Sequence, residues 1–206
     1  MSILAAHVGM TNNLLDWNKD LSKQGENTKG STPLHFAASC GARKRVVSLL
    51  NADRSLAYQC DSMGSFPIHL AVIGRHANVV CELIRKAPDC AQLRDSKGKT
   101  FLHIAIKEGY IKVVRSVFRL LRGTPRFASI INMQDDDGNT GLHLAVLAGT
   151  LQIFSYLLWD KDVMLNLSNY TGKTALDLSR SMIPTRVFFG LVRNLSRYLR
   201  LSVWSI

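Results

Sequence analysis

The chain lacks any apolar stretch long enough to cross a bilayer. A membrane-spanning helix needs about 18 or more apolar residues in succession, and the longest candidate in these 206 residues is the short run Val187–Val192. We therefore expect an intracellular, cytoplasmic chain that is soluble or at most peripheral to a membrane.

Cysteine is also scarce, and it forms no metal or redox motif. The four cysteines have no Cys-x-x-Cys spacing, which favours a reduced, intracellular setting over a disulfide framework. Cys40 and Cys81 fall at expected helical positions, where we expect them to be buried apolar side chains. The other two are Cys60 and Cys90.

Catalytic and nucleotide-binding patterns are missing as well. No serine lies in a nucleophile-elbow context. Gly-Lys-Thr occurs at 98–100 and 172–174, but Leu93 and Leu167 stand where a phosphate-binding loop needs its earlier glycine. The three aspartates at 135–137 lack the other oxygen ligands of a calcium loop and are typical of an exposed turn. We expect no enzyme activity, cofactor or metal.

What the sequence does contain is a pattern that recurs five times, beginning at Gly30, Gly64, Gly98, Gly138 and Gly172. A period near 34 residues is typical of stacked units that cannot bury their apolar faces alone. In the first unit Gly30 suits a turn, Thr32 an N-cap and Pro33 the first helical position. Each unit thus predicts a turn, a short helix, a tight connection and a second helix with an apolar stripe.

This pattern, Gly-x-Thr-Pro-Leu-His-x-Ala-Ala followed by a glycine and paired Val and Leu residues, resembles the ankyrin repeat. The resemblance implies an all-α ankyrin-repeat solenoid of helix-turn-helix units. Five units and a partial one at 1–29 would form an array over 1–184. It also implies that each unit's histidine bonds within and between the turns. The residues expected to be structural are Gly30, Thr32, His35, Gly64, His69, Gly98, Thr100, His103, Gly138, Thr140, His143, Gly172 and Thr174.

Those histidines occur once per unit, which argues against a shared metal. Neighbouring helices lie about 8–10 Å apart, whereas ligands must lie about 2 Å from the ion. In the second unit Phe66 replaces the threonine that would pair with His69. There the expected glycine has moved to Gly74, with Arg75 in its place.

The later units also depart from the pattern. Phe101 and Gly141 replace proline, so we expect looser helix starts, and Asp177 replaces histidine in a frayed last unit that soon meets Pro184. The third unit is six residues longer. We expect this insertion to lengthen its second helix and the following loop. Its arginines predict either a second, basic contact surface or tolerated loop variation: Arg115, Arg119, Arg122 and Arg126.

A repeat stack binds partners mainly through its concave face, made by the turns and the exposed side of the first helices. By repeat position, the candidate partner-binding residues are Met63, Ile73, Lys97, Lys107, Glu108, Asp136, Asp137, Leu147 and Tyr170. The sequence therefore predicts a non-catalytic protein-interaction scaffold with a protein partner of unknown identity.

Residues 14–21 and the long third unit also resemble plant ankyrin proteins of the accelerated-cell-death type. That family joins an ankyrin array to a multi-span membrane domain with a Pro-Gly-Gly motif, which this sequence does not contain. The resemblance implies a role in defence or cell-death signalling, association with the plasma membrane, or a truncated form of a longer membrane protein.

The segment 185–206 alternates arginines with apolar residues, the pattern of a basic amphipathic helix. It suits an anionic membrane surface, which would make the chain a peripheral membrane regulator, or a groove on a partner. It equally suits a cap over the open end of the stack, or a solvated helix face. With 26 Lys and Arg against 15 Asp and Glu, nucleic-acid binding has charge alone in its favour and is not expected.

Overall fold

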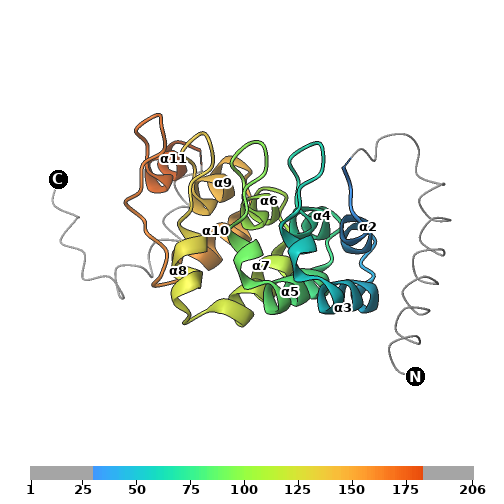
Figure 1. Ribbon diagram of the computed structural model, residues 1–206. Helices are drawn as coiled ribbons and strands as arrows, with labels where there is room; N and C mark the ends of the chain where they lie inside the picture. The colour runs from blue at the N-terminus through green and yellow to red at the C-terminus, as the bar shows by residue number, and fades with distance from the viewer. Residues whose placement is uncertain (1–29, 183–206) are drawn as a thin grey trace, which may run out of the picture.

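The computed structural model describes residues 30–182 as two layers of stacked helices (Figure 1). The expected partial unit at 1–29 and the basic segment at 185–206 lie outside the described residues. One layer holds the first helices α2 (Pro33–Ser39), α4 (Pro67–Ile73), α6 (Phe101–Lys107), α9 (Gly141–Leu147) and α11 (Ala175–Met182). The other holds the second helices α3 (Arg43–Ala52), α5 (Ala77–Lys86), α7 (Ile111–Leu121) and α10 (Leu151–Leu158). The fold is the predicted all-α repeat solenoid.

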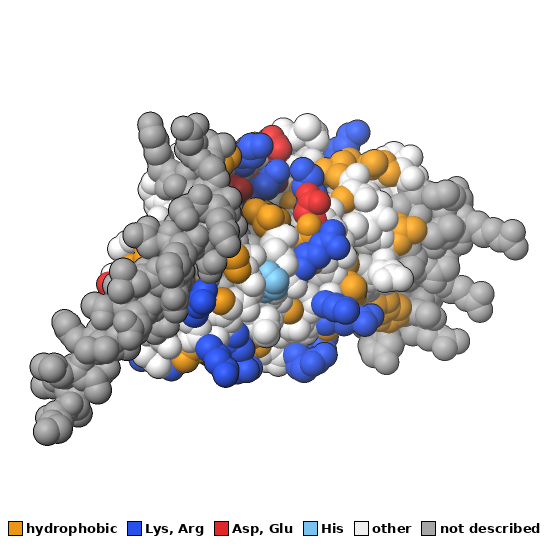
Figure 2. All heavy atoms as spheres, turned by 90° about the vertical axis from the view of Figure 1, so that its right-hand side faces the viewer, with side chains coloured by type: hydrophobic (Ala, Val, Ile, Leu, Met, Phe, Trp, Pro, Cys, Tyr) orange, Lys and Arg blue, Asp and Glu red, His pale blue; other side chains and the backbone are white. Residues whose placement is uncertain are grey.

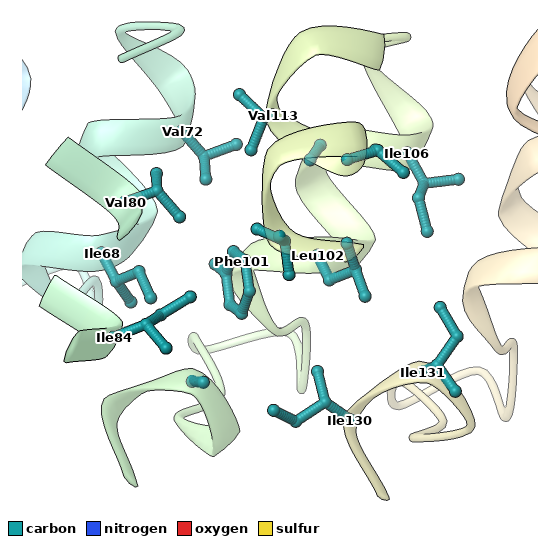
Figure 3. Close-up of a cluster of buried hydrophobic side chains, with 14 of the residues drawn as sticks. Ile68, Val72, Val80, Ile84, Phe101, Leu102, Ile106, Val113, Ile130 and Ile131 are labelled. Atoms are coloured by element: carbon teal, nitrogen blue, oxygen red, sulfur yellow. The ribbon is translucent and has the colours of Figure 1, made fainter. Parts of the chain in front are cut away.

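The core is a continuous band of apolar side chains between the two layers, because each helix is short and buries one face against its neighbours. Small residues such as Ala37, Ala38 and Ala71 are fully buried or nearly so in the first helices, which lets adjacent units approach closely. Figure 3 shows where units two and three meet: Ile68 and Ile84 face Phe101, with Ile130 beside them. No single unit could form this core alone.

The helix starts at Phe101 and Gly141 occupy the same repeat position as the proline starts. Thr100 caps α6 by accepting a hydrogen bond from the His103 backbone N–H. Phe101 is completely buried, so its ring adds core contacts. A Cβ at Gly141 would lie 2.6 Å from Cδ1 of Ile106, so the missing side chain permits close packing. These contacts do not support the expectation that the helices beginning at Phe101 and Gly141 have looser N-terminal ends.

The insertion in the third unit forms a helix where a longer loop was expected. α7 is one residue longer than α5, and a turn at Gly123 then leads into α8 (Pro125–Ile131), which is capped by Thr124. Phe127, Ile130 and Ile131 of α8 are buried. In the two preceding units the same place holds short 3₁₀ helices, Arg54–Tyr58 and Pro88–Gln92. The extra residues therefore extend the core.

The second unit keeps its left-handed residue where the other units have glycine. Arg75 has φ 61° and Gly74 has φ −71°, so the expectation that Gly74 takes over the glycine's role was wrong. Gly74 serves close approach instead, since a Cβ there would lie 2.6 Å from the Ser39 carbonyl oxygen. A left-handed conformation costs a non-glycine residue about 1–2 kcal/mol. The Arg75 guanidinium lies 4.7 Å from the centroid of the Tyr110 ring, a stabilising cation–π contact.

All four cysteines are unpaired, but they are not alike. Cys81 and Cys90 are buried, and burial raises the pKa of Cys90 to about 12. Cys40 and Cys60 are exposed. The expectation of a buried Cys40 was therefore wrong, because this residue caps the C-terminus of α2 on the outer side of the chain reversal.

Buried histidines join the first helices of three units to chain segments 30 residues later. In His35, Nδ1 accepts a hydrogen bond from the Thr32 backbone N–H at 3.0 Å, so the ring proton of the neutral form lies on Nε2. That Nε2–H donates to the Ser65 carbonyl oxygen, 3.0 Å away and 30 residues later. His143 repeats the arrangement with Thr140 and Lys173. His103 accepts from Thr100 in the same way, but its Nε2–H donates to the Met133 carbonyl oxygen, which lies before Gly138 at the end of the third unit.

His69 and Asp177 are the variants of this link. Nδ1 of His69 accepts from the Phe66 backbone N–H at 3.1 Å, but its buried Nε2 makes no hydrogen bond. A buried donor without a partner costs about 1–3 kcal/mol. Asp177 accepts both the backbone N–H and the hydroxyl of Thr174, and these hydrogen bonds lower its pKa. A carboxylate has no N–H to pass on to another turn.

These histidines predict a pH-dependent stability. Burial lowers the pKa of each below 6.5; the residues are His35, His69, His103 and His143. A hydrogen-bonded carbonyl opposes this pKa shift in part for His35, His103 and His143, and the Asp95 carboxylate opposes it for His69. As the pH falls through 6.5, the unfolded chain binds protons that the folded chain does not, so the free energy of unfolding decreases.

We expect full stability above about pH 7.5 and a progressive loss as the pH falls below 6.5, which ends for each histidine once the pH passes its lowered pKa in the folded chain. Carboxylates with lowered pKa, such as Glu82, lose their contribution only in a more acidic range. Urea unfolding across this interval measures the effect. A midpoint that stays constant from about pH 8 to 5.5 would contradict the expectation.

Candidate partner-binding surface

The turns that precede the first helices share one pattern of hydrogen bonds. Asp61 accepts the backbone N–H groups of Met63 and Ser65 through one carboxylate oxygen, at 2.9 and 2.8 Å. Asp95, Asp135 and Asn169 do the same in the later units. Of the acidic run 135–137, which was expected in an exposed turn, Asp135 is instead a buried acceptor at the base of the turn, while Asp136 and Asp137 are exposed.

Neighbouring turns in the later part of the array are joined by backbone hydrogen bonds. The Asp136 backbone N–H donates to the Lys97 carbonyl oxygen at 3.4 Å, and that of Tyr170 donates to the Asp137 carbonyl oxygen at 3.1 Å. Arg94 adds a hydrogen bond to the Gln134 carbonyl oxygen and a contact of 3.8 Å with the Asp136 carboxylate. Figure 1 shows the resulting loops projecting from one side of the stack.

The nine candidate partner-binding residues are all exposed. They form two rows by repeat position. One row runs along the turn tips and the other along the C-terminal ends of the first helices. The turn row is Met63, Lys97, Asp136, Asp137 and Tyr170, and the helix row is Ile73, Lys107, Glu108 and Leu147. We call these nine residues the candidate surface. Their exposure is observed, while binding by them remains a prediction.

The candidate surface carries apolar side chains that a folded chain usually shields. Met63 is 76% exposed and Tyr170 77% exposed, with Ile73 at 53% and Leu147 at 44%. Between them lie the cations Lys97 and Lys107 and the carboxylates of the other three residues. This surface can offer apolar anchors with charges of both signs around them.

A family model described as ankyrin repeats (3 copies) matches residues 2–92 and 53–123. A second, described as ankyrin repeats (many copies), matches residues 126–179. The chain belongs to the ankyrin-repeat family. Ankyrin repeats mediate protein–protein interactions, and the family is typically non-catalytic.

One curated relative is human Rabankyrin-5, which is 46% identical to this chain over 48 residues. The match spans 23% of this chain and 4% of Rabankyrin-5, so only a short part of that protein is compared. It supports the repeat family and carries nothing further about the partner.

The glycines and threonines of the expected structural set share one local geometry. The glycines at 30, 64, 98, 138 and 172 all have positive φ. The threonines at 32, 100, 140 and 174 begin the first helices and bond to the His or Asp three residues later. Among the helices within residues 30–182, none combines the length and the apolar character needed to cross a bilayer.

A groove lined by basic residues, outside the candidate surface, was predicted only in part. Arg115 and Arg119 line a groove together with Arg43, Arg85 and Lys112, which the sequence reading had not singled out. Comparing second helices at the 34-residue period could have found it, because Arg85 and Arg119 occupy the same repeat position. Arg126 does not line this groove and pairs with Asp89 at 2.8 Å.

The stacked turns predict a difference between two glycines of the same unit. Gly138 has φ 75° and Gly149 has φ 66°, so alanine at either position pays about 1–2 kcal/mol for the left-handed backbone. A Cβ at Gly138 would also lie 2.7 Å from the Tyr170 backbone nitrogen, whereas one at Gly149 would meet nothing within 4 Å.

We expect Gly138→Ala to lower the free energy of unfolding by about 1 kcal/mol or more beyond Gly149→Ala, because it displaces the turn that bonds Tyr170. Urea unfolding followed by circular dichroism compares the two variants. Equal losses would show that the turns do not support one another.

Proposed function

We propose that the chain is a protein-interaction scaffold whose partner contacts the candidate surface. The observation that carries this proposal is the exposure of Met63, Ile73, Leu147 and Tyr170 on a regular set of repeat positions. Met63 and Ile73 lie at one part of the array and Leu147 and Tyr170 at another, with charged residues of the candidate surface between them. Exposed apolar side chains rimmed by polar ones are typical of interaction surfaces. Aromatic anchors among them are typical of the residues that dominate binding energy.

The charges on the candidate surface support a partner of mixed charge. Lys97 and Lys107 belong to the third unit, and Asp136 and Asp137 belong to the turn that follows it. Such an arrangement favours one register of the partner over others, because like charges that meet across an interface repel. The apolar anchors would supply affinity and the charges orientation.

The test compares two triple variants, each of which truncates three exposed large apolar side chains. Met63→Ser, Leu147→Ser and Tyr170→Ser alter the candidate surface. Tyr58→Ser, Met164→Ser and Met182→Ser alter exposed apolar residues elsewhere. Proteins that bind the unaltered chain are identified by affinity capture, and their affinities for both variants are then measured.

We expect the first triple variant to bind at least about tenfold more weakly, since truncating a single anchor commonly costs more than 1 kcal/mol. The second triple variant should bind like the unaltered chain. If both bind alike, or if only the second loses affinity, the partner uses another surface.

We also propose a finer role, in plant defence or cell-death signalling, on the resemblance of residues 14–21 and of the long third unit to the accelerated-cell-death type. The alternative is a peripheral membrane regulator that uses the basic segment 185–206, and the alternation of arginines with apolar residues supports it. Co-sedimentation of the full chain with anionic vesicles, compared with a chain ending at Ile183, separates the two. Absence of vesicle binding by the full chain dismisses the membrane alternative.

A further inference from the structure

A groove lined by cations crosses the layer of second helices. It has a volume of about 560 Å³ and runs from Arg43 of α3, across α5, to α7. A second hollow of about 330 Å³ continues it between α7 and Tyr156 of α10, sharing Arg115 and Arg119. Figure 2 shows Lys and Arg side chains gathered along the lower edge of the molecule, the edge that the second helices occupy in Figure 1. We call the two hollows together the basic groove.

The basic groove contains more positive charge than its own acid can balance. Glu82 is the one carboxylate in its lining, and it is buried beneath Arg43 and Arg85, at 2.7 and 3.0 Å. The hydrogen bond from Arg43 is the main cause of the lowered pKa of Glu82. Glu82 thus stays ionised and holds these two guanidinium groups at the edge of the groove.

The three remaining cations have no such partner. Lys112, Arg115 and Arg119 are exposed and make no ion pair with any residue in the part of the chain that the structure describes. Spacings of three and four residues place them on one face of α7, where like charges repel. An anion bound there would remove that repulsion. Arg122, at the far end, already pairs with Asp160 at 2.7 Å.

The shape of the basic groove suits an extended peptide. Four second helices at about 8–10 Å spacing give it a length of about 24–30 Å, which an extended peptide covers with about eight residues. Guanidinium groups pair with carboxylates through two parallel hydrogen bonds. A single-stranded nucleic acid would need aromatic platforms for its bases. The two rings in the lining do not offer one, because Phe118 is buried and the half-buried ring of Tyr156 packs against it at 4.9 Å. A flat bilayer reaches projecting cations more readily than those within a groove.

We propose that the basic groove binds an acidic peptide segment of a partner protein, in extended form, at a site separate from the candidate surface. Carboxylates of the segment pair with Lys112, Arg115 and Arg119. The proposal does not depend on the function proposed above, because no residue belongs to both surfaces.

The test measures binding of a fluorescent peptide of alternating Glu and Gly residues to the full chain by fluorescence anisotropy at low salt. The groove variant is Lys112→Gln, Arg115→Gln and Arg119→Gln. The control variant removes the same charge from exposed cations outside the groove: Arg54→Gln, Lys161→Gln and Lys173→Gln. A peptide of alternating Gln and Gly residues controls for non-electrostatic binding.

We expect the groove variant to bind the acidic peptide about tenfold more weakly than the control variant, since three exposed ion pairs are lost. Circular dichroism should be unchanged in both. Equal weakening of the two variants would mean that binding follows net charge alone, and the proposal would fail.

Two further binding measurements test whether the basic groove binds a different class of ligand. The same variants are tested with phosphatidylserine vesicles and with a single-stranded oligonucleotide. If either of these depends on the groove residues while the acidic peptide does not, the groove serves that ligand and the proposal is wrong. The variant Met63→Ser, Leu147→Ser and Tyr170→Ser should keep peptide binding; its loss there would overturn the separation of the two sites.

Discussion

In three of the five units a buried histidine holds the first helix to a later part of the chain, and the stacking of the turns depends on this link. His35, His103 and His143 accept a hydrogen bond from the residue before their own helix and donate one to a carbonyl 30 residues further along. The first bond fixes the helix start and the second fixes the position of the following turn. The first bond requires a neutral ring, because a protonated Nδ1 cannot accept a hydrogen bond. Burial favours the neutral form by lowering the pKa.

From this link follow the two surfaces. The turns stack through backbone bonds such as Tyr170 to Asp137, which presents their tips as a row along one side. The second helices stack in parallel on the same spacing, so a cation that recurs at one repeat position, as in Arg85 and Arg119, becomes part of a continuous groove. A solenoid thus turns a periodic sequence into extended surfaces, and those surfaces are suited to binding chains rather than to catalysis.

The sequence predicted what depends on local chemistry. Gly30 for a turn, Thr32 as the N-cap residue and Pro33 at the first helical position each act within a few residues, so their patterns could be read directly. It predicted less well what depends on packing between units. No local sequence pattern shows that Gly74 lies against Ser39. Nor does one show that Arg75 adopts the left-handed conformation beside Tyr110, or that Phe101 is buried in the core.

The candidate surface shows the same division. The exposure of Met63 and Tyr170 follows from turn geometry and could be predicted, whereas the basic groove joins side chains from α3, α5, α7 and α10 that no local pattern connects. The insertion was misread as a loop for a related reason. Phe127 and Ile130 lie on the buried face of α8. The core against which this face packs exists only once the neighbouring units are in place.

His69 offers an internal control for the central link, since its Nε2 makes no hydrogen bond. Methionine fills a similar volume in either position. At about pH 8, where the histidines are neutral, we expect His103→Met to lower the free energy of unfolding by about 2 kcal/mol or more beyond His69→Met, because it leaves Thr100 and the Met133 carbonyl without partners. Urea unfolding of the two variants is the direct measurement. Equal losses, or a larger loss for His69→Met, would contradict the account.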